Sequence, residues 1–229
     1  MTTEKKPKKG APKRKATKDE DSPSSAPQIY IVDPFSAGPR DQKPRRVYLY
    51  GDLEEERAAE VVSTLLTLQE CGEEEVHEDP ADIDSPVKEI VYKPIDFYIS
   101  SFGGSAADMF SIYDVMHEIK ETCDIRTVGL GKVMSAGVLL LAAGTKGQRR
   151  IARNCRVMIH SVAGGQWGPI YNLENEMEEM HYLQQQYTKA IVSETNMSER
   201  YLKKLLNRKV NVYLSAEEAV EHGIADELY

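Results

Sequence analysis

A serine and a histidine near the middle of the chain have the types and local settings of a nucleophile and its base. Ser135 follows a β-like run at 125–130 and precedes an apolar Ala/Leu/Gly-rich segment that predicts a helix buried all round. A serine at a strand-to-helix turn has backbone N–H groups directed at whatever its side chain attacks. His160 ends the strand-like run 155–159 and precedes a glycine-containing loop. Because a serine hydroxyl is a weak nucleophile until a base takes its proton, the pair indicates nucleophilic catalysis.

Each of these residues also has a purely structural interpretation. Taken alone, a serine between Met134 and Ala136 in an apolar run is usually the first residue of a helix. Likewise, a histidine at the end of a strand can be a core residue with its hydrogen bonds satisfied. The glycine-rich turn at 103–105 and the family spacing described below favour the chemical interpretation.

That turn is the second candidate site feature. Gly103 and Gly104 lie between a predicted strand at 95–100 and a predicted helix that begins after Ser105. Paired glycines let the backbone approach a ligand without a Cβ in the way. A phosphate loop is one interpretation, but the segment lacks the lysine and the spacing of a P-loop.

The rest of the chain predicts one globular domain with appendages. Its 229 residues are 41% hydrophobic and 29% charged, and strand-like runs alternate with helix-like ones, which predicts an α/β fold with right-handed crossovers. The predicted strands are 46–50, 95–100, 125–130, 155–159 and 209–213. The predicted helices follow residues 52, 105 and 135 and span 171–194, 198–208 and 215–223, the last opened by a capping-box pattern.

The helix at 171–194 is long and has one apolar face. Its apolar residues are Leu173, Met177, Met180, Leu183, Tyr187 and Ile191. Their spacing predicts that this face is buried on something. Periodicity alone leaves open whether it packs in the core or at an interface between subunits.

A basic segment precedes the predicted domain, and an acidic segment lies within it. Residues 1–28 are rich in lysine and poor in apolar residues, so we expect a disordered basic tail. The tail lacks the interleaved aromatic residues that stack on bases, and the rest of the chain is acidic, so nucleic-acid binding is disfavoured.

We expect residues 70–90 to form an acidic surface insertion without periodicity. Its possible metal ligands are Glu73, Glu74, Glu75, His77 and Asp79, but a flexible segment offers no fixed geometry, and we expect no metal site.

Three cysteines bear on the compartment. Cys71, Cys123 and Cys155 are odd in number and lack CxxC spacing, which indicates reduced thiols and a cytoplasmic protein. An odd offset of five residues puts Cys155 on the strand face opposite His160, so we exclude it as the nucleophile. No run of 18 apolar residues predicts a membrane span, and no apolar stretch follows the charged N-terminus as in a secretory signal.

Several motifs in order carry a family resemblance. They are FYISSFGGS (97–105), SIYDVMHEIK (111–120), MSAG (134–137), AAGTKGQRRIARNCRVMIHS (142–161) and YLSAEEAVEHGIADEL (213–228). Together they resemble the ClpP family, the proteolytic subunit of the Clp protease. The resemblance covers roughly residues 47–229 and includes the separation of Ser135 from His160.

The resemblance implies a fold and an activity. The fold is a ClpP/crotonase-like arrangement of repeated strand–helix (ββα) units, with the helix at 171–194 as a protruding handle. The activity is that of a serine endopeptidase that cleaves unfolded polypeptides. Ser135 is then the nucleophile and His160 the base, while the N–H groups of Gly104 and Ala136 form the oxyanion hole.

The resemblance also implies partners. ClpP-like subunits form a homo-oligomeric barrel of two stacked heptamers, a tetradecamer, and an AAA+ Clp unfoldase controls entry. That partner alone uses ATP, so the chain itself needs no cofactor. Residues 29–46 correspond to an axial, partner-facing segment. The helix that the family carries before its first core strand is shortened or absent between Arg40 and Arg46, which bears on docking of the partner.

One departure from the family concerns the histidine's partner. Family members carry aspartate where this chain has Asn211. An Asn carbonyl can hold the imidazole ring but cannot stabilise the imidazolium as a carboxylate does. Two rivals to the active protease follow: a catalytically weak or inactive ring subunit that modulates a paralogue, and a crotonase-like acyl-CoA enzyme, which needs no Ser/His pair. The sequence also predicts no binding pocket of one charge sign, so we expect loose specificity.

Overall fold

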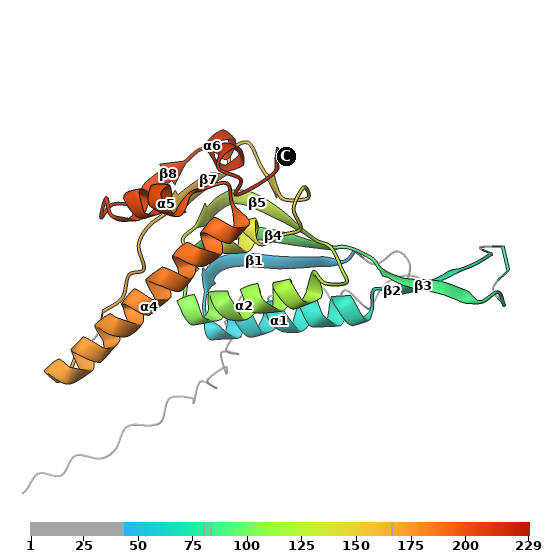
Figure 1. The fold of residues 1–229 in the computed structure, drawn as a ribbon, viewed down its shortest axis with the longest axis horizontal. Coiled ribbons are helices and arrows are strands. Elements are labelled where there is room, and N and C mark those ends of the chain that lie inside the picture. The colour runs from blue at the N-terminus through green and yellow to red at the C-terminus, as the bar shows by residue number, and fades with distance from the viewer. Residues whose placement is uncertain (1–43, 80, 83, 166) are drawn as a thin grey trace, which may run out of the picture.

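The computed structural model describes residues 44–229 apart from 80, 83 and 166 (Figure 1). The basic tail predicted at 1–28 and nearly all of the partner-facing segment predicted at 29–46 lie outside the described residues. The described elements are β1 (Arg46–Leu53), α1 (Glu55–Glu70), β2 (Glu73–His77), β3 (Val87–Tyr92), β4 (Ile95–Gly104), α2 (Ala106–Ile119), β5 (Ile125–Met134), α3 (Ala136–Ala142), β6 (Arg150–Ile151), β7 (Arg156–Ile159), α4 (Ile170–Glu194), α5 (Glu199–Leu206), β8 (Val212–Leu214), α6 (Ala216–Glu221) and β9 (Glu227–Leu228).

The main sheet is largely parallel, which confirms the predicted α/β class. In the described part of the chain it runs β1-β4-β5-β6-β9, with β7 paired to β5 and β8 paired to β7. Every pairing is parallel except β7 with β8. Strands β4 and β5 are buried on both faces at their centres, residues 99–101 and 127–129, as parallel strands under helices are. Across the described residues, every helix is too short or too polar to span a bilayer.

Helices α1 and α2 lie side by side beneath the sheet (Figure 1). The buried face of α2 comes from Met109, Ile112, Met116 and Ile119, as their spacing predicts. The Ser105 side chain caps α2 by accepting a hydrogen bond from the Asp108 N–H. Helix α3 is buried at every position, which confirms the prediction of a helix buried all round.

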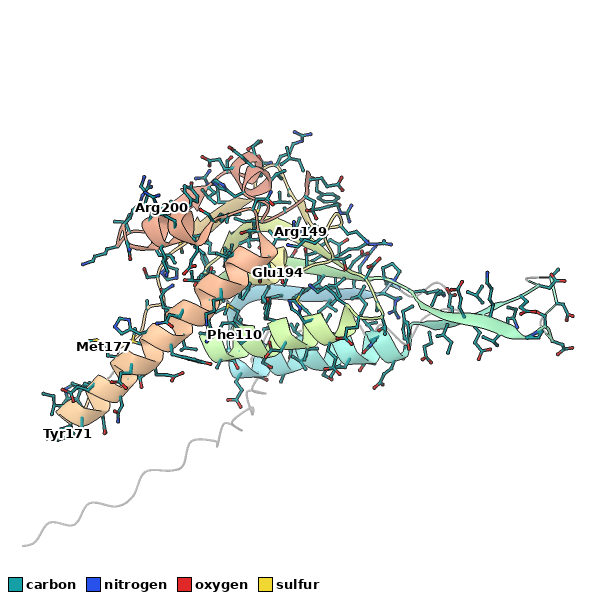
Figure 2. The ribbon with its side chains drawn as sticks, in the orientation of Figure 1. Phe110, Arg149, Tyr171, Met177, Glu194 and Arg200 are labelled. Carbon is teal, nitrogen blue, oxygen red and sulfur yellow. The ribbon has the colours of Figure 1, made fainter. Side chains whose placement is uncertain are left out.

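Helix α4 leaves the body of the protein. Its buried residues lie only in its C-terminal third, between Tyr187 and Glu194. The N-terminal part extends beyond the sheet and carries the exposed side chains of Tyr171 and Met177 (Figures 1 and 2). Met177 is 59% exposed although it belongs to the apolar face that was expected to be buried. Within the described chain, that face is therefore covered at one end only.

Two predictions of local structure are wrong. The segment at 70–90 contains the antiparallel hairpin β2–β3, which projects from the body (Figure 1). Successive glutamates in β2 hide the alternation that a strand normally shows, so the pattern indicated a loop. The strand predicted at 209–213 begins only at Val212, because Lys209 has a positive φ of 56° that takes the chain out of extended geometry. Strands β6 and β9 have two residues each and were not predicted.

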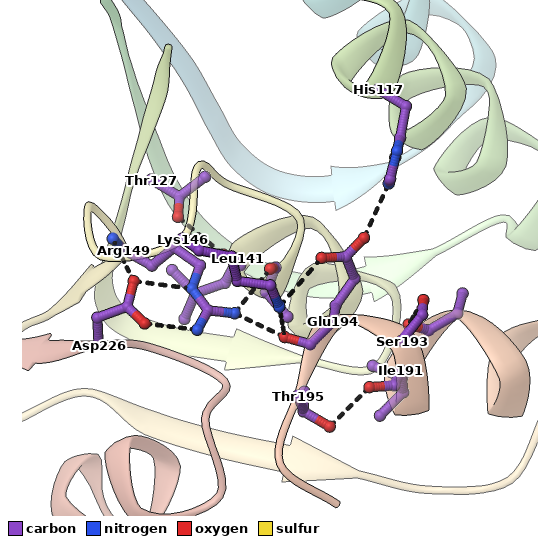
Figure 3. Close-up of polar contacts among 12 residues, drawn as sticks. His117, Thr127, Leu141, Lys146, Arg149, Ile191, Ser193, Glu194, Thr195 and Asp226 are labelled. Atoms are coloured by element: carbon purple, nitrogen blue, oxygen red, sulfur yellow. Dashed lines mark hydrogen bonds and ion pairs between the residues drawn. The ribbon is translucent and has the colours of Figure 1, made fainter. Parts of the chain in front are cut away.

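One buried arginine ties the ends of two helices to the C-terminal segment (Figure 3). The Arg149 guanidinium donates to the carbonyls of Ala142 at 3.0 Å and Glu194 at 2.7 Å, the last residues of α3 and α4. Those carbonyls lack partners within their helices and lie at the negative end of each helix dipole. Its Nε also donates to Asp226 at 2.9 Å. Burial alone would raise the pKa of Asp226, but hydrogen bonds from Arg149 outweigh it and hold that pKa below its usual range.

A second set of contacts joins α2 to the end of α4. The Glu194 carboxylate accepts hydrogen bonds from the Tyr113 hydroxyl at 3.1 Å and, when His117 carries the proton on Nε2, from that nitrogen at 2.8 Å. Lys146 pairs with the same carboxylate at 3.3 Å. Burial raises the pKa of Glu194, but Lys120, Lys146 and His117 together lower it below its ordinary value. The buried carboxylate is therefore ionised and fully partnered at neutral pH.

We expect Arg149→Met to reduce the free energy of unfolding by about 3–5 kcal/mol, because it removes one partner of a buried ion pair, takes the guanidinium donor from the Ala142 carbonyl and leaves the Glu194 carbonyl with Lys146 as its donor. The measurement is chemical denaturation followed by circular dichroism. The matched control is Arg156→Met on the exposed side of β7, which should change stability by about 0.5 kcal/mol or less. Equal midpoints for the two variants would contradict a stabilising role for Arg149.

Candidate active site

Ser135 sits on a sharp turn between β5 and α3. Its φ of 52° and ψ of −120° are unusual for a residue with a Cβ and cost about 1–3 kcal/mol. The surrounding backbone holds it there: its N–H donates to Met158 at 2.8 Å, and its carbonyl accepts from the Val138 N–H at 3.0 Å. Ser135 occupies the N-cap position of α3, yet its side chain makes no capping hydrogen bond. The hydroxyl therefore does not cap the helix, as the hydroxyl of an ordinary helix-start serine does.

The hydroxyl of Ser135 instead contacts His160. Its Oγ lies 2.8 Å from His160 Nε2. The two residues meet because β7 pairs in parallel with β5, with Met158 opposite Met134, so both strands deliver their next residues to the same edge. Burial lowers the pKa of His160 below its ordinary value. At neutral pH the imidazole is therefore uncharged, which a base that accepts the serine proton requires.

Two glycines at the end of β4 adjoin this pair. A Cβ on Gly103 would lie 2.6 Å from Ser135 Cβ, and one on Gly104 would lie 2.0 Å from the Leu53 carbonyl oxygen. Both also have positive φ, 96° and 153°. No larger residue fits either position without displacing backbone. The paired glycines were expected to allow close approach of the backbone, but the family resemblance gave a catalytic role to Gly104 alone; the structure places Gly103 against Ser135 as well.

The backbone N–H groups near the serine belong to the end of β4 and the start of α3. The Ser105 N–H donates to the Leu53 carbonyl at 3.0 Å, on the β1 side. The Ala136 N–H is in the first turn of α3, where amides have no partner within the helix. Gly104, Ser135, Ala136 and His160 all line one cleft of about 390 Å³.

Helix α4 forms one wall of the cleft, and the loop after His160 is attached to it. The Gln184 side chain accepts a hydrogen bond from the Val162 N–H at 2.7 Å. The buried Tyr187 hydroxyl donates to the Ser135 carbonyl at 3.2 Å. Neither contact was predicted, because each joins residues more than 20 positions apart. A larger depression of about 640 Å³ beside α5 contains none of these residues, so size alone does not locate the site.

Asn211 lies apart from the cleft. It is exposed and precedes β8. The last pair of the β7–β8 ladder is Ile159 with Val212, so continuing the register would set Asn211 opposite His160. Among the hydrogen bonds of the described residues, however, none joins the two side chains. The structure therefore brings four of the five predicted site residues together and leaves the fifth unattached.

Other candidate groups do not form sites. Cys155 is buried, and burial raises the pKa of its thiol to about 11, so it is not a thiolate at neutral pH. In the hairpin, the His77 ring nitrogen Nδ1 is within 2.7 Å of the Ser85 carbonyl. Over the described residues, no group of three or more His, Cys, Asp or Glu side chains is placed to hold a metal ion.

Comparison with known families agrees with this geometry. A protein-family model described as Clp protease matches residues 87–229, more than half of the chain. The chain belongs to the Clp protease family. The match confirms the resemblance and the fold class, and it supports a ClpP-type peptidase over an acyl-CoA enzyme. The matched region begins after β1 and α1. Both elements nonetheless belong to the same body of this Clp protease family protein, because β1 pairs with β4 and α1 packs on α2.

We expect Tyr187→Phe to slow reaction of Ser135 with a fluorophosphonate about three- to tenfold, because the carbonyl of the strained serine loses one of its two donors while the ring stays in place. The thermal midpoint should change little. The matched control is Tyr182→Phe, an exposed tyrosine on the same helix. Unchanged labelling by Tyr187→Phe would contradict a positioning role.

The lowered pKa of His160 has a consequence for the pH dependence. The serine reacts when the imidazole is neutral, so the labelling rate should rise with pH through the pKa of His160 in the folded protein. Because burial lowers that pKa, the midpoint should fall below about 6.5, the ordinary value for histidine. Labelling rates between pH 4.5 and 8 measure it, and a midpoint above 6.5 would contradict the assignment.

Proposed function

We propose that this Clp protease family protein is a serine endopeptidase that cleaves unfolded polypeptides. The observation that carries the proposal is the 2.8 Å contact between Ser135 Oγ and His160 Nε2, made by a strained serine within a cleft. Ser135 attacks a peptide carbonyl while His160 takes its proton as general base. His160 then gives that proton to the leaving amine as general acid. Water next attacks the acyl ester while His160 takes its proton, and the Ser135 oxygen leaves as His160 returns a proton to it.

The oxyanion of each tetrahedral intermediate needs donors beside the nucleophile. In this proposal the N–H groups of Gly104 and Ala136 supply them, each typically worth about 3–4 kcal/mol of transition-state stabilisation. The place of Gly104 and Ala136 in the same cleft as Ser135, and the helix-start position of Ala136, support these roles. The lack of a side chain at Gly103 supports them too, because it lets the two segments approach.

Asn211 orients His160 weakly in this proposal. Its amide oxygen accepts the Nδ1–H bond once the segment before β8 moves toward the ring. An amide does not neutralise the imidazolium that forms during the reaction. In a serine protease of another fold the corresponding change lowers kcat by about 10⁴. The exposed, unbonded position of Asn211 also supports the rival proposal of a weak or inactive ring subunit that modulates an active paralogue.

The proposed assembly is a homo-oligomeric barrel of two stacked heptamers, a tetradecamer, fed by an AAA+ Clp unfoldase that alone uses ATP. The exposed apolar side chains on the protruding part of α4 support an interface there. Tyr48 and Tyr50 are half exposed beside each other at the edge strand β1, with Tyr48 stacked on Tyr98, which supports a protein-binding surface. The cysteines are all free, as expected in the cytoplasm.

The deciding experiment is fluorophosphonate labelling of the assembled protein. We expect wild type to label, Ser135→Ala and His160→Ala to lose labelling, and Asn211→Asp to label faster because a carboxylate stabilises the imidazolium. Asn154→Asp, an exposed change of the same kind, is the matched control. Absence of labelling in assembled wild type would overturn the active protease, and rescue by Asn211→Asp alone would establish the inactive subunit.

A further inference from the structure

One face of α4 forms the wall of the catalytic cleft. Four residues of this helix line the cleft: Glu176, Met180, Leu183 and Tyr187. Their spacings of four, three and four residues put them in one row on the helix surface. The row ends next to the nucleophile, since the Tyr187 hydroxyl contacts the Ser135 carbonyl. Glu176 is eleven residues earlier, about 16 Å along the helix axis. The cleft therefore runs from Ser135 toward the exposed part of α4.

The cleft is apolar over most of this length. Met109, Val162, Met180 and Leu183 contribute apolar side chains between the nucleophile and the far end. Among the described residues that line the cleft, Glu176 is the one Asp, Glu, Lys or Arg side chain. No ion pair in the described part of the chain engages its carboxylate. The wall thus presents an apolar stretch that ends in one unpaired negative charge.

We propose that Glu176 gives the cleft a preference for substrates with a lysine or arginine side chain in it. Such a side chain has an apolar stem that packs against Met180 and Leu183 and a cationic end that reaches the carboxylate. An acidic side chain is disfavoured twice, by the apolar wall and by repulsion from Glu176. This inference rests on the proposed peptidase function. It narrows the loose substrate specificity expected from the sequence, in which no pattern places Glu176 in the same cleft as Ser135.

The expected effect is moderate. Glu176 is exposed, so water and salt weaken its attraction for a cation. We expect a roughly three- to tenfold preference in kcat/KM for a cationic over an isosteric neutral side chain. The preference should shrink as ionic strength rises, because the carboxylate lies at the open end of the cleft.

The test uses assembled full-length protein and blocked peptides with a coumarin amide as leaving group. Three peptides differ only in the residue two positions before the one whose carbonyl Ser135 attacks: lysine, norleucine or glutamate. Norleucine matches the lysine stem without its charge. A second series varies the attacked residue itself, which points to the same face of an extended peptide. Because Glu176 lies well beyond the reach of a side chain bound at Ser135, we expect the lysine peptide to be cleaved fastest in the first series. Glu176→Gln should remove the preference and Glu176→Lys should reverse it.

Two controls separate the possible outcomes. Glu178→Gln removes the same charge from the same helix, about 200° around its axis and outside the cleft, and should keep the preference. Fluorophosphonate labelling has no peptide side chain and should proceed equally in wild type and Glu176→Gln. Ser135-dependent cleavage with the same lysine-to-glutamate ratio in wild type and both Glu176 variants would overturn the inference alone. Absence of Ser135-dependent cleavage and labelling would overturn the proposed function and the inference with it.

Discussion

The backbone of Ser135 is the constraint on which the rest of the site depends. A serine with φ of 52° and ψ of −120° persists only where its surroundings hold it. Three elements do so: β7 through the Met158 carbonyl, α3 through the Val138 N–H and α4 through the Tyr187 hydroxyl. The resulting turn frees the hydroxyl from capping α3 and directs it to His160. The strain is thus coupled to the packing of the sheet, the buried helix and the protruding helix.

The two helices that hold Ser135 are themselves joined at their far ends. Arg149 binds the terminal carbonyls of both α3 and α4, and Asp226 from the C-terminal segment neutralises it. Helix α3 begins directly after Ser135, and α4 contacts Ser135 through Tyr187. Both helices contact Arg149 through the carbonyl at their C-terminus. Because an arginine buried to 96% loses hydration, its hydrogen bonds are strong only while every acceptor stays in place. Arg149 thus ties α3, which begins after Ser135, to α4, which lines the cleft.

The parts of the site that follow strand ends were predictable from sequence, and the parts that depend on tertiary contacts were not. Ser135 and His160 stand directly after β-like runs, and parallel strands deliver such residues to one edge. The contact of Tyr187 with Ser135 spans 52 residues and leaves no local signal. Glu176 has the sequence context of any exposed helix residue. The hairpin β2–β3 was missed because its strands pair only with each other and one of them consists mostly of glutamates.

The position of Asn211 follows from how β8 begins. Only three residue pairs join β7 to β8, and the positive φ of Lys209 turns the preceding chain away from the sheet. Burial lowers the pKa of His160, whereas a neighbouring carboxylate would raise it. A base of lower pKa accepts the serine proton less readily but stays neutral in more acidic solution. In the proposed mechanism, an asparagine in place of a carboxylate therefore gives a weaker base that remains neutral over a wider pH range.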